Sequence, residues 1–277
     1  MSFGFKSLGV RSISAVFFVV LLLGSVCWNY ISFTVFFLLV SLMALTEFFH
    51  LSRQIGVIPY RMAGYICAVA LYLLFVQTGV TADPVSYAVF LLPVIVFGTA
   101  LFGRNDQPFT AVLFTLGGLL YCVAPFALLH LIVFRFTGDG VTYDPRLLLG
   151  VIFLIWSSDT FAYLTGRLVG RTKLAVHISP GKTWEGTTGG LIATVVVSLL
   201  IKEYLYSPPG NYWILLGFTV PVVATLGDLF ESLLKRRAGV KDSGSIMPGH
   251  GGILDRFDSL LFVAPFVVAI LDLLELH

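Results

Sequence analysis

The stretch from Leu226 to Asp258 gathers acids, bases and glycines in a chain that is otherwise strongly apolar. Asp228, Glu231 and Lys235 are spaced by three and four residues, so a helix would place them on one face. Charged side chains are costly near a membrane unless they are paired or functional. This stretch is therefore the first candidate for a functional site.

Carboxylates from two helix ends, joined by a basic loop rich in glycine, suit a divalent cation and a polyphosphate. Proteins hold Mg²⁺ with a few carboxylates and leave other positions to substrate phosphates, while basic side chains and loop N–H groups bind phosphate oxygens. We predict that Asp228 and Asp255 are metal ligands, with Asp258 as a further ligand and Glu231 as an orienting residue. The alternative is that these acids only form salt bridges with nearby basic residues such as Lys235.

The segment from Ser232 to Asp258 resembles the signature of the phosphatidate cytidylyltransferase, or CDP-diacylglycerol synthase, family. The matching residues are Ser232, Lys235, Arg236, Lys241, Asp242, Gly244, Pro248, His250, Gly251, Gly252, Asp255, Arg256 and Asp258. Met247 departs conservatively from the apolar residue expected at its position. The resemblance implies transfer of CMP from CTP to phosphatidate, which gives CDP-diacylglycerol and pyrophosphate, with Mg²⁺ as cofactor.

The resemblance also implies roles for individual residues. Asp228, Lys235 and Asp255 are the expected catalytic residues. The expected substrate-binding residues are Ser179, Lys182, Arg236, Lys241, His250, Gly251, Gly252 and Asp159. The turn His250-Gly251-Gly252 would present N–H groups to phosphate at a helix start, although His250 could also be a general base or a hydrogen-bonded turn residue.

A second basic stretch runs from Arg167 to Glu185. Gly181-Lys182-Thr183 is not a P-loop, because Val176 stands where the Walker pattern needs glycine. The segment 179–185 resembles a recurrent segment of the same family, which implies a place beside the nucleotide or the lipid phosphate without deciding between them. The alternative is a loop that only sets topology or touches anionic lipid.

Other polar residues within apolar stretches have less certain roles. Asp159 must face the protein interior or a wet cavity, because an unpaired carboxylate in lipid is costly; it either lines the site or pairs with a base such as Arg256. Glu47, near the end of an apolar run with His50 and Arg53, is interpreted as part of an interfacial cluster, and a link to the site is the alternative. Small residues such as those at 117–118 and the pair 186 and 190 predict close helix packing.

Composition places these motifs in a membrane. Of 277 residues, 57% are hydrophobic and 12% charged, with a mean hydropathy of +0.94 and a net charge of +2. Soluble domains have roughly 25% charged residues. Lys6 and Arg11 precede the first apolar run, which we interpret as an uncleaved helix. The predicted fold class is an all-α polytopic membrane protein.

Nine spans are expected, because a crossing needs about 20 apolar residues. They lie near residues 13–28, 31–50, 61–80, 85–103, 110–134, 146–168, 185–206, 212–234 and 254–275. With the N-terminus in the cytoplasm and the C-terminus outside, all of the 17 basic residues except Arg135, Arg146 and Lys202 fall inside. Both basic loops then face cytoplasmic nucleotides.

The predicted organisation is a single membrane domain of residues 1–277 in the inner (cytoplasmic) membrane. Residues 1–140 would be scaffold and interface, and residues 141–277 would be catalytic. Expected partners are CTP, phosphatidate and membrane lipids, without nucleic acid; a homodimer is one option for the assembly. The competing functions are another CTP-dependent lipid enzyme, such as a polyprenol kinase, and a transporter, although the charges cluster at one interface rather than at the bilayer midplane.

Overall fold

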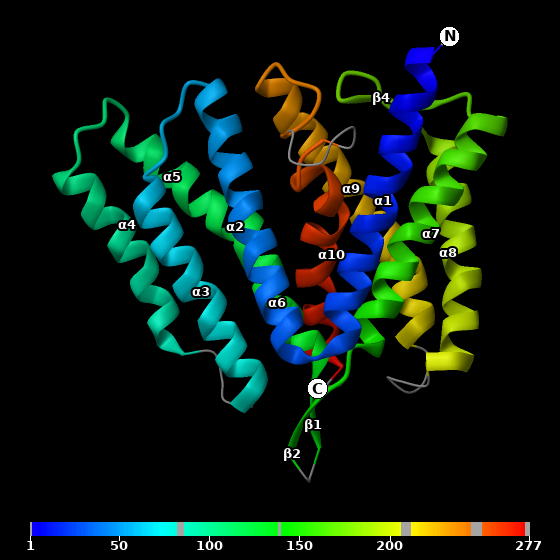
Figure 1. The fold of residues 1–277 in the computed structure, drawn as a ribbon, viewed down its shortest axis with the longest axis horizontal. Helices are drawn as coiled ribbons and strands as arrows, with labels where there is room; N and C mark the ends of the chain where they lie inside the picture. Colours follow the sequence, from blue (N-terminus) through cyan, green and yellow to red (C-terminus); the bar gives the residue numbers. More distant parts are fainter. Residues whose placement is uncertain (1, 82–85, 138–139, 206–211, 245–250, 275–277) are drawn as a thin grey trace.

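A computed structural model of the chain describes residues 2–81, 86–137, 140–205, 212–244 and 251–274. Within these ranges, each of the expected spans coincides with helix (Figure 1). The helices are α1 (Ser2–Trp28), α2 (Tyr30–Gln54), α3 (Arg61–Thr81), η1 (Tyr87–Phe90), α4 (Leu91–Phe102), α5 (Pro108–Gly118), η2 (Leu119–Val123), α6 (Ala124–Val133), α7 (Arg146–Val169), α8 (Trp184–Leu205), α9 (Tyr212–Arg237) and α10 (Leu254–Leu273).

Six helical stretches of the described chain are long and apolar enough to cross a membrane. They are Tyr30–Gln54, Arg61–Thr81, Pro108–Val133, Arg146–Val169, Trp184–Glu203 and Tyr212–Arg237. Ser14–Trp28 and Tyr87–Phe102 are shorter apolar helices, and α10 carries Asp255, Arg256 and Asp258 in its first turns. The chain is an α-helical multi-pass membrane protein, and the count of nine spans stays a prediction.

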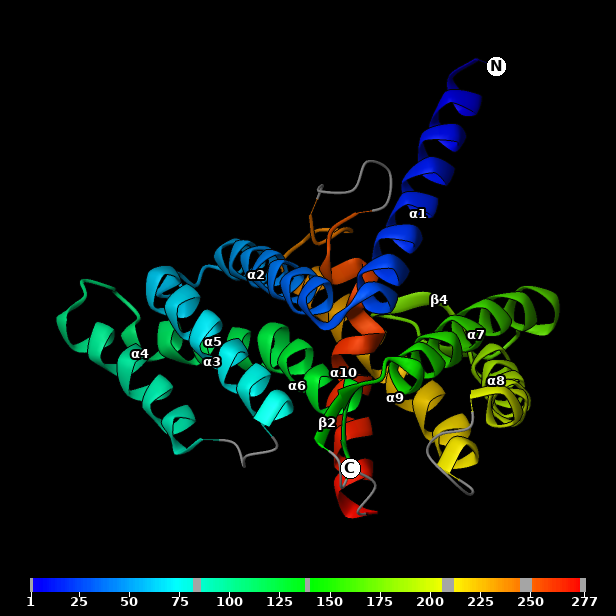
Figure 2. The same cartoon turned by 60° about the horizontal axis from the view of Figure 1, so that its bottom comes forward.

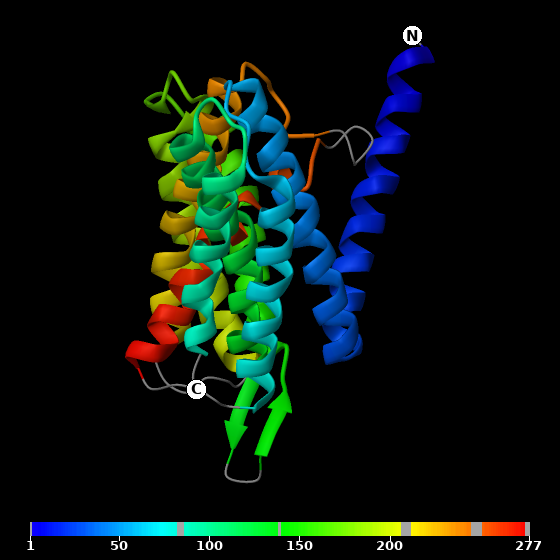
Figure 3. The same cartoon turned by 90° about the vertical axis from the view of Figure 1, so that its left-hand side faces the viewer.

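α10 lies in the middle of the bundle, with α2 to α6 on one side and α7 to α9 on the other (Figures 1 and 2). It packs most extensively on α9 and α6, which belong to these two different groups. α1 contacts α2 near their shared turn and then diverges from the bundle, as Figure 3 shows. α10 therefore joins the half of the chain predicted to be scaffold to the half predicted to be catalytic.

The segments that carry the charged and polar residues singled out from the sequence lie at one end of the bundle. The end of α2, the end of α9, the start of α10 and the basic loop after α7 all lie at the top of Figure 1, as does the start of α1. The other end of α10 lies at the opposite end of the molecule (Figure 1). Which end faces the cytoplasm stays a prediction from the distribution of basic residues.

The fold is consistent with the expected all-α class, and two of its connections form short antiparallel hairpins. β1 (Phe134–Thr137) pairs with β2 (Gly140–Tyr143), and β3 (Lys173–Ala175) pairs with β4 (Ser179–Thr183). The first hairpin is tied to α1 because the Tyr143 hydroxyl donates to the Val26 carbonyl at 2.6 Å. The second hairpin is the basic loop noted in the sequence.

The turn between α1 and α2 is tight, with Asn29 alone between the two helices. The Asn29 side chain accepts a hydrogen bond from the Ser32 N–H at 2.9 Å, and the Ser32 hydroxyl accepts one from the Asn29 N–H at 3.2 Å. This capping box satisfies N–H groups at the start of α2 that have no partner within the helix. It also fixes the direction in which α2 leaves the turn.

Aromatic rings fill the space where α2, α6 and α10 meet. Phe126 and Phe257 pack edge to face with ring centroids 5.3 Å apart, and Phe37 lies 5.7 Å from Phe126 and 6.2 Å from Phe257. Phe37, Phe126 and Phe257 are all buried. Edge-to-face pairs add to the stabilisation from burial alone. This cluster anchors α10 against the first half of the chain within its charged first turns, because Phe257 lies between Arg256 and Asp258.

Close packing between α7 and α8 depends on glycine. A Cβ at Gly190 would lie 2.8 Å from the Ser158 carbonyl oxygen, and one at Gly186 would lie 2.7 Å from the Ala162 carbonyl oxygen. The prediction of close packing at these two glycines is therefore confirmed. It is wrong for Gly117, because a Cβ there would meet nothing within 4 Å, whereas one at Gly118 would contact Leu45.

Replacing Gly190 by alanine tests this packing. Gly190→Ala forces α7 and α8 apart, because the clash is with backbone, and we expect a loss of roughly 1–3 kcal/mol in the free energy of unfolding. The matched control is Gly117→Ala, which fills open space in a helix and should stabilise the protein by about 0.5–1 kcal/mol. Thermal unfolding of the detergent-solubilised variants measures both; equal melting temperatures would contradict the role of Gly190.

Candidate functional site

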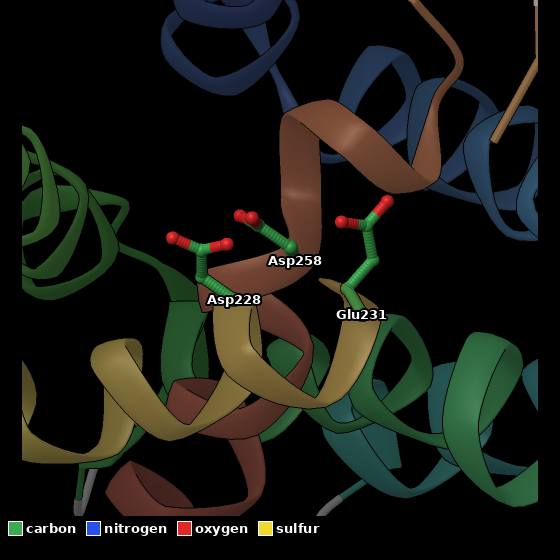
Figure 4. A group of neighbouring side chains, drawn as sticks. All are labelled: Asp228, Glu231 and Asp258. Carbon is green, nitrogen blue, oxygen red and sulfur yellow. The ribbon is translucent and has the colours of Figure 1, made fainter. Parts of the chain in front are cut away.

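Asp228 and Glu231 on α9 and Asp258 on α10 form one carboxylate cluster, hereafter the acid cluster (Figure 4). One oxygen from each carboxylate lies within 4.8 Å of the others. Gly227 lets the two helices approach, because a Cβ there would lie 2.5 Å from the Asp258 carbonyl oxygen. Among the described residues, this is the one group of acidic, histidine or cysteine side chains spaced to hold a metal ion.

The surroundings of Glu231 indicate whether the acid cluster is suited to bind a cation. Glu231 is the most deeply buried of the three, with 1% of its surface exposed. Lys235 Nζ forms an ion pair with Glu231 Oε2, and Glu231 Oε1 has no hydrogen-bond donor. A buried carboxylate oxygen without a donor is costly. This oxygen and the three-carboxylate donor set fit a hard divalent cation such as Mg²⁺.

Lys235 connects the acid cluster to Asp255. Its Nζ pairs with Glu231 and lies 2.6 Å from Asp255 Oδ1. Asp255 Oδ2 accepts hydrogen bonds from the Ser243 N–H at 2.8 Å, the Ser243 hydroxyl at 2.9 Å and the Gly252 N–H at 2.8 Å. Both Asp255 oxygens are thus engaged by donors of the protein, and Asp255 lies beside the acid cluster rather than in it. Whether it reaches a bound metal stays a prediction.

The N–H groups of Gly252, Ile253 and Leu254 at the start of α10 are paired within the protein, and the phosphate-binding role expected for the turn 250–252 stays a prediction. The Gly252 N–H is donated to Asp255, and the N–H groups of Ile253 and Leu254 are donated to Glu47. Gly251 has φ +80°, and a Cβ there would lie 2.5 Å from Asp255 Oδ2. Glycine is needed here because of this left-handed backbone and the close carboxylate. His250 lies outside the described residues.

The β3–β4 hairpin brings the second basic stretch to the acid cluster. Lys182 of β4 forms an ion pair with Asp228. The other Asp228 oxygen accepts a long hydrogen bond, 3.3 Å, from the Ser232 hydroxyl. The base of the hairpin is held by Glu185, whose carboxylate accepts the N–H groups of Arg171 and Thr172 at 3.1 Å. The two polar stretches of the sequence therefore form one site.

Two cavities open on either side of the acid cluster. The first, hereafter the polar cavity, has a volume of about 420 Å³ and lies between α7, α8, α9 and β4. Its lining includes Ser158, Arg167, Ser179, Lys182, Thr183 and Asp228. The second, hereafter the α1 cavity, has a volume of about 320 Å³ and lies between α1, α7 and α10. Its lining includes Phe18, Leu22, Ile155, Trp156, Arg256 and Asp258.

Asp159 lines both cavities, and so stands where they meet. This places its carboxylate on a cavity wall, as the cost of an unpaired acid in lipid predicted. Ser179 and Lys182 also lie on the polar cavity, as expected of substrate-binding residues. Arg236 instead makes a long contact, 3.4 Å, to the Ile178 carbonyl oxygen of the hairpin, and Lys241 is exposed. The substrate-binding roles of these residues stay predictions.

Glu47 is the residue of this network that the sequence analysis assigned elsewhere. It was interpreted as interfacial, but it is 5% exposed and bonded to the start of α10. The signal that could have found it is the one used for Asp159, an acid inside an apolar stretch that must be satisfied by something. Its partners lie about 200 residues further along the chain, so the sequence did not name them.

Comparison with known proteins shows the family of the chain. The model of the cytidylyltransferase family matches residues 9–274. The chain is 40% identical over 171 residues to a phosphatidate cytidylyltransferase of Haemophilus influenzae, and 41% identical over 175 residues to one of Staphylococcus aureus. It is 49% identical over 121 residues to one of Bacillus subtilis.

These matches cover 58%, 62% and 43% of this chain and 57%, 64% and 45% of the respective relatives. The chain thus spans less than two thirds of the length of each of these relatives. The family match, in contrast, runs through every described helix, including those that carry the acid cluster. The chain belongs to the cytidylyltransferase family.

Proposed function

We propose that the protein transfers the cytidylyl group of CTP to phosphatidate, giving CDP-diacylglycerol and pyrophosphate, at the cytoplasmic face of the inner membrane. The observation that carries this proposal is the ion pair between Lys182 of the hairpin and Asp228 of the acid cluster. It brings a basic loop that could bind phosphate and an acidic group that could bind a metal ion into one site. The names of the similar relatives and the membership of the family support the same reaction.

The two cavities suggest where each substrate binds. CTP suits the polar cavity, because Arg167, Lys182 and hydroxyl side chains there can neutralise and hydrogen-bond a triphosphate. Phosphatidate suits the α1 cavity, because its apolar lining from α1 and α7 fits acyl chains and Arg256 lies beside Asp258 for the phosphate. The acid cluster lies between them, with Asp228 on one cavity and Asp258 on the other.

In the proposed reaction a phosphate oxygen of phosphatidate attacks the α-phosphorus of CTP. A new P–O bond forms, the bond between the α-phosphorus and the bridging oxygen to the β-phosphorus breaks, and pyrophosphate leaves with the electron pair. Both substrates are anions, so positioning and charge neutralisation are the protein's main tasks. Held by Asp228, Glu231 and Asp258, Mg²⁺ would supply positive charge to the phosphates of both substrates and the leaving group.

The protein's own residues prepare this site. Lys235 forms ion pairs with both Glu231 and Asp255. It therefore keeps these carboxylates of α9 and α10 close together before any substrate binds. Lys182 is held at the cluster by Asp228 and is placed to pass to a phosphate oxygen once a cation takes the carboxylate. Asp159 lines both cavities, so its carboxylate lies within reach of the binding region of either substrate.

The decisive experiment follows label from CTP into lipid. Purified protein is incubated with phosphatidate, Mg²⁺ and CTP that carries one label on the cytosine and another on the γ-phosphate. The cytosine label is expected in the extracted lipid and the γ label in pyrophosphate. The γ label alone in the lipid would identify a kinase instead, and neither label in the lipid would contradict both functions.

The acid cluster is tested by removing one charge at a time. Asp228→Asn and Asp258→Asn should each lower kcat/KM by roughly 10–100-fold or more and raise the Mg²⁺ concentration needed for half-maximal rate. Asp106→Asn, in the exposed connection between α4 and α5, is the matched control and should change neither. Variants at 228 and 258 with the wild-type Mg²⁺ dependence would remove the acid cluster from the metal site.

The assignment of substrates to cavities is tested by their Michaelis constants. Arg167→Ala should raise KM for CTP roughly tenfold by removing a charge-assisted contact, with little change in KM for phosphatidate. Trp156→Ala, on the α1 cavity, should do the reverse, because it removes apolar lining. The opposite pattern would exchange the two cavities.

A further inference from the structure

A buried carboxylate from the first half of the chain holds the start of α10. Glu47 Oε1 accepts the Ile253 N–H at 2.8 Å, and Glu47 Oε2 accepts the Leu254 N–H at 2.9 Å. The Ser243 hydroxyl lies 2.8 Å from Glu47 Oε2. In the described part of the chain, no basic side chain forms an ion pair with Glu47. Among the described residues, the direct partners of its carboxylate are hydrogen-bond donors.

The position of Glu47 has a physical reason. The first N–H groups of a helix have no partner within the helix, and the helix dipole places partial positive charge there. A carboxylate that accepts two such N–H groups satisfies both conditions at once, and these charge-assisted bonds are stronger than neutral ones. Glu47 thus occupies the place at the start of α10 that the sequence suggested for a phosphate.

The loop backbone lies so close to the Glu47 side chain that only glycine fits at the neighbouring positions. A Cβ at Gly244 would lie 2.5 Å from Glu47 Oε1, and a Cβ at Gly252 would meet both Glu47 oxygens and the Ser243 hydroxyl. The glycines of this loop are therefore explained by the approach of Glu47. They bring the backbone close enough to donate to it.

The contacts continue from Glu47 to the acid cluster. The Ser243 hydroxyl lies within hydrogen-bond distance of both Glu47 Oε2 and Asp255 Oδ2, so its single proton is shared between two carboxylates. Asp255 is bound to Lys235, which pairs with Glu231 of the cluster. Every step of this path from α2 to α9 is a direct polar contact.

We propose that Glu47 is a positioning residue: it fixes the start of α10 through Ile253, Leu254 and Ser243, and so sets where Asp258 stands relative to Asp228 and Glu231. The role rests on the proposed function insofar as the acid cluster holds a metal. Loss of the Glu47 charge frees the N–H groups of α10 and lets its first turn move. The acid cluster then loses affinity for the cation although all three of its carboxylates are still present.

The test uses the full-length protein in detergent without CTP or lipid. Glu47→Gln keeps the size of the side chain but removes its charge and one acceptor. Amide hydrogen exchange at 253 and 254 should become roughly tenfold faster, and the Kd for Mn²⁺, measured by electron paramagnetic resonance as a probe for Mg²⁺, should rise roughly 10–100-fold. In the transfer assay, kcat should fall while KM for phosphatidate stays unchanged.

Ser41→Ala is the matched control, since Ser41 is also buried in α2 but its hydroxyl donates only to the Leu38 carbonyl of the same helix. It should leave exchange at 253 and 254 and the Mn²⁺ affinity at wild-type values. Unchanged exchange and unchanged Mn²⁺ affinity in folded Glu47→Gln would overturn the proposal. So would a Ser41→Ala variant with the same defects, because the effect would then come from any change in α2.

Ser243→Ala keeps the proposal testable if Glu47→Gln does not fold. It removes the shared hydroxyl while the Ser243 N–H to Asp255 bond remains, and it should weaken Mn²⁺ binding severalfold. Wild-type Mn²⁺ affinity in Ser243→Ala would then overturn the proposal. If the wild-type protein has no transfer activity but Glu47→Gln still changes amide exchange and Mn²⁺ affinity, the proposed function is contradicted. The proposal for Glu47 is then not contradicted.

Discussion

The structure depends on how it neutralises carboxylates that are gathered at one end of an apolar bundle. Acids from α2, α9 and α10 lie close together where water is scarce, and their mutual repulsion would separate the helices if it were not met. Lys182 and Lys235 supply positive charge, and the N–H groups at the start of α10 supply hydrogen bonds. The remaining deficit, at Glu231, is what suits the site to a cation.

The apolar parts of the fold serve this arrangement by making the helices approach closely. Gly227 brings α9 against α10, and Gly186 and Gly190 bring α8 against α7, below the hairpin that carries Lys182. The aromatic rings of α2, α6 and α10 anchor the central helix at its charged start, through Phe257. Where helices pack in lipid without a hydrophobic driving force, such small residues and polar contacts supply the attraction.

The acid cluster lies between two cavities, and this position bears on how the two proposed substrates could meet. A water-soluble triphosphate and a lipid must meet although one prefers polar surroundings and the other the bilayer. The polar cavity is lined mainly by hydroxyl and charged side chains, whereas the α1 cavity combines apolar side chains with Asp255, Arg256 and Asp258; both include Asp159. α1 diverges from the bundle beside the second cavity, where acyl chains would enter between helices (Figure 3).

The sequence by itself determined the class of protein, the position of each helix and the two polar stretches that form the site, because hydropathy and residue spacing are local properties. It placed Asp228 and Asp258 at one site because both are acids at the ends of two helices that one basic, glycine-rich loop joins. Only the tertiary structure decided that Glu231 belongs to the acid cluster, that Asp255 is engaged by Lys235 and backbone N–H groups, and that Glu47 reaches α10. These contacts join residues on different helices, and helix packing alone sets such distances.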